Sequence, residues 1–325
     1  MKTEIKEKIT ATNQKYLKKF LTEEAPAKLE SQLEHMDWSY LDMIHNKEQQ
    51  RGTPLAAMEL SEIEANKDKY LATGLDAVKN GKVGAILLAG GQGTRLGFDK
   101  AKGMFNIGKT KELYIFEQLV ANLMKVTNQT GTWVPLYVMT SEINDSMTRE
   151  FFEEHDYFGY NKDYVKFFVQ EMVPAVDFDG NLLMKSEDSL AMSPNGNGGW
   201  FKSLINAGLD KDLKDKGVEW LNVFGVDNVL QQIADPVFVG AIIESGCVSG
   251  SKVVRKCDPY ERVGAMCLEN GKPSIVEYYE LTPEMAEAKN ENGSLQYGFG
   301  VILNYLFRVD KLMAIAEKSL PLHVV

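Results

Sequence analysis

The sequence predicts an α/β fold, a mostly parallel sheet preceded by a helical extension, and two patterns support this prediction. The first is an alternation of short apolar runs (83–88, 134–139, 164–170 and 221–226) with helically spaced segments (111–127, 148–155 and 236–245). Alternation of this kind favours a parallel sheet covered by helices on both faces. The second is a pair of apolar runs, 263–268 and 275–279, around Asn270-Gly271, which predicts an antiparallel hairpin beside that sheet.

Residues 1–80 have a different texture and are expected to form a helical extension. Apolar residues recur near helical spacing between Lys and Glu residues, at Leu17, Phe20, Leu21, Leu29 and Leu33. No chemistry-bearing motif occurs in this stretch, so packing against the main domain is its simplest role. Residues 81–325 are then expected to form the functional domain.

Composition excludes several classes of protein. The 325 residues carry a net charge of −10, which disfavours sequence-independent binding to nucleic acid or to an anionic membrane. The chain starts without the apolar core of a signal peptide, and no apolar run approaches the roughly 20 residues of a membrane span. Cys247, Cys257 and Cys267 show no paired spacing, which favours free thiols and a cytoplasmic location. The four histidines form no zinc-ligand pattern.

A glycine-rich loop follows the first predicted strand, at residues 88–97 (LAGGQGTRLG). Glycines without Cβ atoms let the backbone come close to a phosphate or a base and point its amides at it. Arg95 adds a cation with bidentate reach, and Lys102 follows seven residues later. In open α/β sheets, ligands bind beyond the carboxyl ends of the strands, so the loops after Leu88, Gln170 and Val226 are the places to expect a site.

Two other phosphate motifs fail on spacing. No GxxxxGK[ST] string of a P-loop occurs in the chain, and residues 91–97 are one residue too long for the GxGxxG dinucleotide fingerprint. A dinucleotide-dependent oxidoreductase is therefore disfavoured. Taken alone, the glycine cluster is also compatible with a tight turn that carries an ordinary surface arginine.

Five segments in order resemble one family. The string LLAGGQGTRLG with its Lys-Gly-Met segment is similar to the eukaryotic-type UDP-N-acetylglucosamine pyrophosphorylases and related UDP-sugar pyrophosphorylases. The similarity continues through residues 167–175 (FFVQEMVPA), 193–199 (SPNGNGG), 226–228 (VDN) and the stretch from Gly264 to 275–278 (IVEY), and so covers roughly residues 83–310. The resemblance implies a Rossmann-like sheet in a nucleotidyltransferase domain at 81–325.

The resemblance also implies an activity: transfer of a uridylyl group from UTP to a sugar 1-phosphate, with release of pyrophosphate. Charge in this reaction is spread over phosphate oxygens, so catalysis depends on positioning and electrostatic stabilisation, and no nucleophilic side chain is needed. Arg95 and Lys102 are implied to face the triphosphate as catalytic cations. The nucleotide-binding positions implied are Leu88, Ala89, Gly90, Gly91, Gln170, Gly196 and Asn197.

Metal and sugar contacts are implied at three further positions. Asp227, at the end of an apolar strand, corresponds to a ligand of Mg²⁺, although an isolated Asp there would more often cap a turn. Gly264 and Glu277 correspond to sugar-contacting positions, where the carboxylate could accept hydrogen bonds from hydroxyl groups. For Glu277 the plainer interpretation is an exposed strand residue.

The sequence departs from the family pattern in two places. Relatives acting on N-acetylhexosamine carry Asn-Ala-Gly-Asn where this chain has residues 298–301 (GFGV), and Val301 cannot make the hydrogen bond of the second Asn. This departure favours a hexose such as glucose or galactose over N-acetylglucosamine, or a relaxed specificity. The apolar ending at 322–325 (LHVV) suggests that a C-terminal segment of the family, with a further lysine, is missing.

A different class of function stays open. The protein could be a non-catalytic nucleotide-sugar binding or regulatory relative, in which Asp227→Ala would change neither UTP affinity nor turnover. The retained cations Arg95 and Lys102 argue against this alternative. The sequence leaves the identity of the sugar, the direction of the reaction and the oligomeric state open.

Overall fold

The computed structural model describes residues 1–39, 41 and 52–316, which form two compact units. The described residues of the first unit are 1–39, 41 and 170–200, and those of the second are 52–169 and 201–316. The helical segment predicted for residues 1–80 is divided between them, since residues 60–79 belong to the second unit.

The first unit is a small helical cluster with two short hairpins. Its helices are α1 (Thr3–Ala11), η1 (Lys15–Leu21) and α2 (Ala27–His35), and β5 (Met172–Pro174) pairs with β8 (Met192–Pro194), as β6 (Met184–Ser186) does with β7 (Ser189–Leu190). The predicted apolar positions Leu17, Phe20, Leu29 and Leu33 are buried in one core with Leu182 and Leu190. The helical spacing therefore did identify the face that packs.

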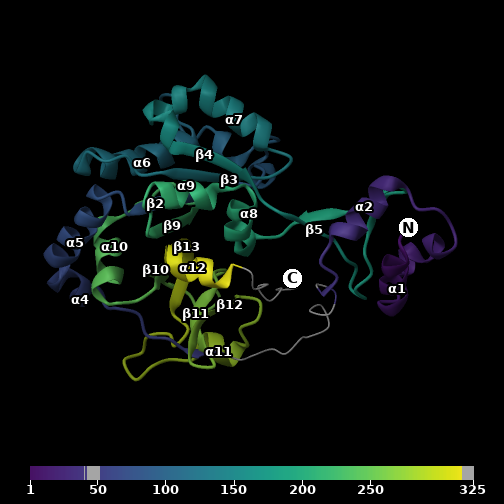
Figure 1. The fold of residues 1–325 in the computed structure, drawn as a ribbon. Coiled ribbons are helices and arrows are strands. Elements are labelled where there is room, and N and C mark those ends of the chain that lie inside the picture. The colour runs from purple at the N-terminus through teal and green to yellow at the C-terminus, as the bar shows by residue number, and fades with distance from the viewer. Residues whose placement is uncertain (40, 42–51, 317–325) are drawn as a thin grey trace. The chain divides into compact units, whose positions relative to one another are not determined.

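The second unit is built on a parallel core of four strands. In the order β9 (Trp220–Gly225), β2 (Val83–Leu88), β3 (Leu136–Thr140) and β4 (Val165–Val169), each strand pairs parallel with the next (Figure 1). Every residue of β2, β3 and β9 is buried. Burial on both faces explains why these strands are uninterrupted apolar runs in the sequence.

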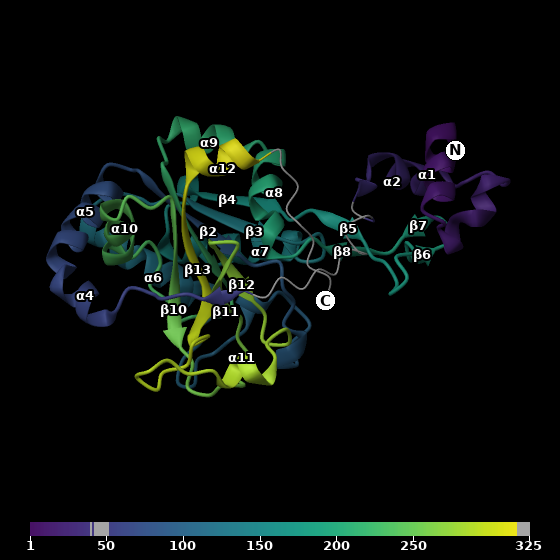
Figure 2. The same cartoon turned by 90° about the horizontal axis from the view of Figure 1, so that it is seen from below.

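Antiparallel strands extend this core into a nine-stranded sheet (Figure 2). The long β13 (Phe299–Arg308) pairs with β9, and β10 (Ser249–Arg255), β11 (Ala265–Glu269), β12 (Lys272–Val276) and β1 (Thr53–Pro54) complete it. The predicted hairpin is confirmed as β11 and β12, with Asn270 and Gly271 at φ of 51° and 75°. Positive φ at both turn residues is the geometry that an Asn-Gly hairpin turn provides.

Helices flank the sheet between these strands. They are α4 (Leu60–Ala65), α5 (Lys67–Lys79), α6 (Ile115–Thr130), α7 (Asp145–Glu154), α8 (Trp200–Asn206), α9 (Leu209–Asp215), α10 (Pro236–Glu244), α11 (Pro283–Glu287) and α12 (Val309–Ile315). The short 3₁₀ turns of this unit are η2 (Thr94–Leu96), η3 (Lys102–Met104), η4 (Asp156–Gly159) and η5 (Lys162–Tyr164), whereas η6 (Asn197–Gly199) belongs to the first unit. Helices α5 and α10 lie side by side (Figures 1 and 2). In the described part of the chain, no helix is long and apolar enough to cross a membrane.

Candidate functional site

The glycine-rich loop and Asp227 emerge at the same edge of the parallel core. Strands β2 and β9 are parallel neighbours whose last residues, Leu88 and Gly225, are paired in register. The backbone N–H of Val226 donates to the carbonyl of Leu88 at 3.1 Å, which continues the pairing one step beyond the strand. Parallel strands have their carboxyl ends at one edge of a sheet, so the loops after Leu88 and Val226, two of the three places where a site is expected, emerge together.

A backbone clasp fixes the loop after β2. The N–H of Gly93 donates to the carbonyl of Lys100 at 2.9 Å, and the N–H of Lys102 donates to the carbonyl of Gly91 at 3.2 Å. Between them, Gly97 turns the chain with φ of 67°, a conformation that glycine adopts without steric cost. The clasp carries Lys102 back to the glycines, although it lies seven residues beyond Arg95 in the chain.

Lys102 and Asp227 form an ion pair. The Lys102 Nζ atom lies 2.5 Å from Asp227 Oδ1, and the two side chains are 19% and 68% exposed. At the next residue, Gly103, a Cβ atom would lie 2.2 Å from the ring of Phe116 on α6, so the backbone packs directly on that ring. Two residues chosen from separate sequence motifs are thus brought together by the fold.

Solvent exposure increases along the start of the glycine-rich loop. Leu88 and Ala89 are buried, Gly90 is half-buried and Gly91 is exposed, with no atom within 4 Å of the place where its Cβ would be. Arg95, on η2, is exposed and makes no ion pair with the residues that the structure describes. The loop therefore offers open backbone and a cation that is free to meet an anionic ligand.

Asp227 offers a single carboxylate. Among the described residues, no three His, Cys, Asp or Glu side chains gather in a way that could hold a metal ion. This donor set does not suit zinc, which takes three or four protein ligands. It does suit Mg²⁺, which keeps several waters and binds through one or two carboxylates together with substrate phosphates.

Buried amides that the sequence analysis missed lie under the Asp227 loop. Gln231 Nε2 donates to the carbonyl of Gly225 at 2.8 Å, and Gln231 Oε1 accepts from Asn304 Nδ2 at 3.2 Å. Asn304 Oδ1 in turn accepts from Asn222 Nδ2 at 2.8 Å. All three amides are at least 95% buried. For Asn222 and Asn304, a polar residue inside an apolar strand was the available signal, since a buried amide requires partners.

The predicted sugar segment is also assembled. The N–H of Val301 donates to the carbonyl of Gly264 at 2.9 Å. A Cβ atom on Gly264 would lie 3.3 Å from both Glu277 Oε2 and Val301 Cγ2. Gly264, Glu277 and Val301, the residue that differs from the family pattern, are therefore neighbours. They pack so closely that a Cβ atom on Gly264 would also lie 2.9 Å from Ile275 Cγ2.

Three predicted nucleotide-binding residues belong to the first unit. Gln170 follows β4 and is 7% exposed, whereas Gly196, at φ of 68°, begins the turn that contains Asn197. The loop is tied to residue 171 by a hydrogen bond from the N–H of Asn195 to the carbonyl of Glu171, at 3.1 Å. This hydrogen bond brings the segments next to Gln170 and Gly196 together within the first unit. Contact of these residues with a nucleotide stays a prediction.

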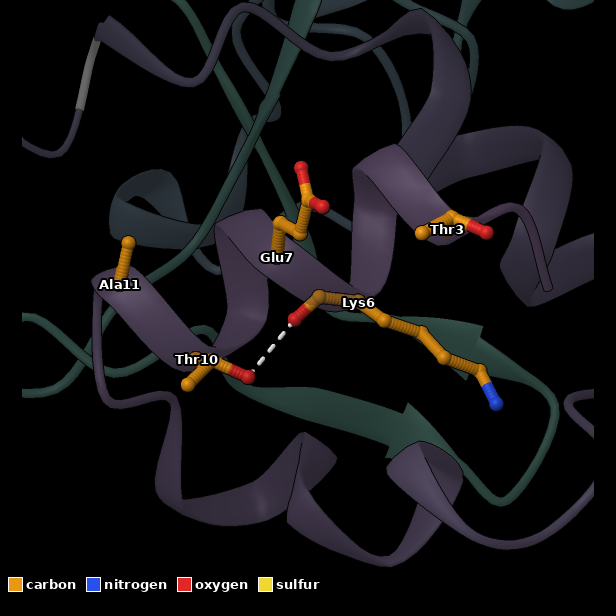
Figure 3. A pocket seen from close by; sticks show the side chains of 5 residues that line it. All are labelled: Thr3, Lys6, Glu7, Thr10 and Ala11. Atoms are coloured by element: carbon orange, nitrogen blue, oxygen red, sulfur yellow. Dashed lines mark hydrogen bonds between the residues drawn. The ribbon is translucent and has the colours of Figure 1, made fainter.

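Two hollows are lined by other residues. The one in Figure 3, of about 370 Å³, is lined by side chains of α1 alone: Thr3, Lys6, Glu7, Thr10 and Ala11. The other, of about 290 Å³, is lined by residues of 255–259 and 289–298. Neither contains a predicted site residue, and a hollow along a single helix does not enclose a ligand.

Comparison with known proteins agrees with the motif order. Residues 17–324 match the family described as UTP–glucose-1-phosphate uridylyltransferase. The chain is 40% identical over 267 residues to a UDP-N-acetylhexosamine pyrophosphorylase-like protein 1 of Xenopus tropicalis, covering 79% of this chain and 52% of that protein. It is 34% identical over 321 residues to the UDP-N-acetylglucosamine pyrophosphorylase of Saccharomyces cerevisiae, covering 95% and 67%.

Solved structures agree as well. The uridine diphosphate N-acetylglucosamine pyrophosphorylase of Trypanosoma brucei, in complex with an inhibitor, superposes with a TM-score of 0.80 at 28% identity, over 96% of this chain and 67% of that one. The chain thus spans about half to two thirds of the length of these relatives.

Proposed function

Since the chain belongs to the UTP–glucose-1-phosphate uridylyltransferase family, we propose that the protein transfers a uridylyl group from UTP to a sugar 1-phosphate and releases pyrophosphate. The observation that carries the proposal is the convergence of the glycine-rich loop, Lys102 and Asp227 at one edge of the sheet. A loop of free amides, a cation and a carboxylate are the parts that phosphoryl-type transfer requires.

The reaction is an in-line displacement at the α-phosphorus of UTP. A phosphate oxygen of the sugar 1-phosphate forms the new O–P bond, and the bond from the α-phosphorus to the bridging oxygen breaks, so that pyrophosphate leaves with the electron pair. Lys102 and Arg95 would stabilise charge on the phosphate oxygens and on the leaving group. The amides of Gly90, Gly91 and Gln92 would hold the nucleotide, which leaves the side chains to act on the reacting phosphates.

We propose Mg²⁺ as the metal and Asp227 as its protein ligand. When bound there, the ion would supply neutralisation of phosphate charge. The exposed carboxylate has room for waters and phosphate oxygens as the other ligands. Lys102 would exchange its contact with Asp227 for one with the phosphates.

For the sugar, two observations point in different directions. The curated relatives are named for N-acetylglucosamine or N-acetylhexosamine, which makes N-acetylglucosamine 1-phosphate the first candidate. Val301, next to Gly264 and Glu277, favours a plain hexose 1-phosphate, because it offers no hydrogen bond to an acetamido group. We therefore propose both as substrates to compare.

The test is direct. The protein is incubated with UTP, Mg²⁺ and a panel of sugar 1-phosphates, and pyrophosphate release is measured together with UTP binding. Turnover with at least one sugar supports the proposal. UTP binding without turnover, insensitive to Asp227→Ala, would favour the non-catalytic relative instead.

The free thiols Cys247, Cys257 and Cys267 support a reducing, cytoplasmic setting for the reaction.

A further inference from the structure

Asn144 occupies a position that no motif singled out. It precedes α7, in the turn after β3, and its side chain is fully buried. An Asn at the start of a helix normally caps that helix with its side chain. Here the side chain makes no capping hydrogen bond, so its amide is engaged elsewhere.

The amide of Asn144 bridges two loops. Its Oδ1 accepts from the N–H of Ser141 at 2.8 Å, within its own turn. Its Nδ2 donates to the carbonyl of Ala89 at 3.0 Å and, at 3.5 Å, to the carbonyl of Gly91. The Asn144 side-chain amide therefore donates both of its hydrogens to carbonyls of the glycine-rich loop. Among the described residues, Asn144 is the one hydrogen-bond donor to the Ala89 carbonyl.

The orientation of those carbonyls fixes the orientation of two amides. In a planar trans peptide, the C=O of one residue and the N–H of the next point in opposite directions. Carbonyls of Ala89 and Gly91 that face Asn144 therefore turn the N–H groups of Gly90 and Gln92 away from it. No backbone carbonyl of the described residues accepts from either N–H, and the space beside Gly91 is open.

We propose that Asn144 is a positioning residue, which aims the N–H groups of Gly90 and Gln92 at the phosphates or base of the nucleotide. The inference rests on the proposed function and adds a residue to it. Lys102 contributes too, since its backbone N–H also donates to the Gly91 carbonyl, at 3.2 Å. The carbonyl of the peptide between Ala89 and Gly90 accepts from Asn144 alone among the described residues, so the loss of Asn144 should change the orientation of the Gly90 N–H most.

Two substitutions separate positioning from simple stability. Asn144→Ala removes both sets of hydrogen bonds, and UTP affinity should fall about tenfold while kcat changes less than KM for UTP. Asn144→Asp keeps the side-chain shape and the oxygen that accepts from Ser141. It replaces the amide nitrogen by a carboxylate oxygen, which cannot donate to the Ala89 carbonyl. Its UTP affinity should be lower still at neutral pH and should recover as the pH falls, because the protonated carboxyl is again a donor.

A matched control is Tyr160→Phe. The Tyr160 hydroxyl is buried and donates to the carbonyl of Val134 at 2.7 Å, just before the start of the same strand β3, so its loss also removes a buried donor to a carbonyl. This variant should lose stability as Asn144→Ala does and keep the UTP affinity of the wild type.

The closing experiment measures UTP binding by calorimetry and, in the ligand-free protein, the NMR shifts and hydrogen exchange of the Gly90 and Gln92 amides. Weakened binding with altered amides in both Asn144 variants, and neither in the Tyr160 control, is the expected result. UTP affinity within about twofold of wild type and unchanged amides in Asn144→Ala would overturn the inference and leave the proposed function standing. Absence of UTP binding by the wild type would instead refute the proposed function and, with it, the assigned role of Asn144.

Discussion

Lys102 and Asp227 are 125 residues apart in the chain, yet Nζ and Oδ1 lie 2.5 Å from each other. The pair joins the loop after β2 to the loop after β9. The carboxylate that would bind a metal ion is thus already neutralised by a lysine that would bind phosphate. A nucleotide would draw the lysine to itself and free the carboxylate, so metal and nucleotide binding should be coupled.

The coupling predicts opposite effects of one substitution. Lys102→Met should raise the affinity of the nucleotide-free protein for Mn²⁺, because Asp227 loses its competing cation. The same substitution should lower kcat by about 100-fold, since a cation that stabilises phosphate charge is gone. Mn²⁺ binding is measured by EPR and turnover by pyrophosphate release.

A nearby lysine provides the control. Lys100→Met changes an exposed lysine of the same loop whose side chain makes no ion pair with the residues described, and both measurements should stay within about twofold of wild type. Unchanged Mn²⁺ affinity in Lys102→Met would show that the ion pair does not compete with the metal.

Gln231 should matter for stability and for the metal together. Gln231→Met keeps the side-chain length but removes the donor to the carbonyl of Gly225 and one acceptor of the Asn304 amide, which still donates to the carbonyl of Gln232 at 3.4 Å. Each buried group left unsatisfied costs about 1–3 kcal/mol, so the free energy of unfolding should fall by at least that much. Urea denaturation measures this fall.

The Mg²⁺ dependence of activity tests whether the loss of Gln231 disturbs the loop that carries Asp227. Because Gly225 lies two residues before Asp227, Gln231→Met should also raise the Mg²⁺ concentration needed for half-maximal activity. Gln14→Met, which removes an equally buried amide from the first unit, should lower stability without this change. Equal Mg²⁺ dependence in the two variants would assign Gln231 to stability alone.

The sequence predicted the parallel strands, the hairpin and the edge at which the loops after Leu88 and Val226 meet, because these follow from local patterns. Strand β2 is apolar throughout since it is buried on both faces, and Asn270-Gly271 can hardly form anything but a tight turn. Lys102 and Asp227 were each named from a local motif. Their direct contact was not predicted, because it depends on strand order, which places β9 beside β2 across more than a hundred residues.

Asn144 and Gln231 could not be found from the sequence for a different reason. Their roles lie in hydrogen bonds to backbone carbonyls of distant loops, and any Asn or Gln can make such bonds. Every residue has a backbone carbonyl, so the residue type does not show which carbonyl accepts such a bond. Similarly, the division of the first 80 residues between two units depends on which core each helix contacts, and amphipathic helices do not specify a partner.

Asp212 should give the protein a measurable acid sensitivity. Although burial acts to raise the pKa of this carboxyl, hydrogen bonds from Lys216 and Tyr137 outweigh it and lower the pKa below its ordinary value. A lowered folded-state pKa contributes stability that is present above the unfolded pKa and is lost as the pH falls through the folded pKa. The wild type should therefore exceed Asp212→Asn in free energy of unfolding at neutral pH, and the difference should vanish in acid. Urea denaturation across pH measures it, and a difference independent of pH would refute the assignment.

Helices α5 and α10 pack closely enough that glycine is required between them. A Cβ atom on Gly240 would lie 1.8 Å from the carbonyl oxygen of Tyr70, and one on Gly74 would lie 1.8 Å from that of Pro236. Gly240→Ala should lower the free energy of unfolding by about 1–3 kcal/mol, although Ala is the better helix former. As a control, Ala72→Gly at an exposed site of α5 should cost about 1 kcal/mol through helix propensity alone. A Gly240→Ala variant as stable as the wild type would show that the helices can separate without cost.

Val301 should decide how the protein discriminates between sugars. Its N–H donates to the carbonyl of Gly264, and its Cγ2 lies as close to the Cβ position of Gly264 as Glu277 Oε2 does. Val301→Asn replaces an apolar branch by an amide of similar size, which could donate to an acetamido carbonyl. The ratio of kcat/KM for N-acetylglucosamine 1-phosphate to that for glucose 1-phosphate should then rise by about tenfold.

The neighbouring Glu277 separates recognition of the acetamido group from recognition of the sugar hydroxyls. Glu277→Gln should weaken both sugars alike, because the hydroxyls that it would accept from are common to them, and so leave the ratio unchanged. Competition assays with both sugar 1-phosphates present give the ratio directly. If Val301→Asn changes both sugars equally, the acetamido group is not recognised at this position, and the preference for one sugar must arise from residues elsewhere in the protein.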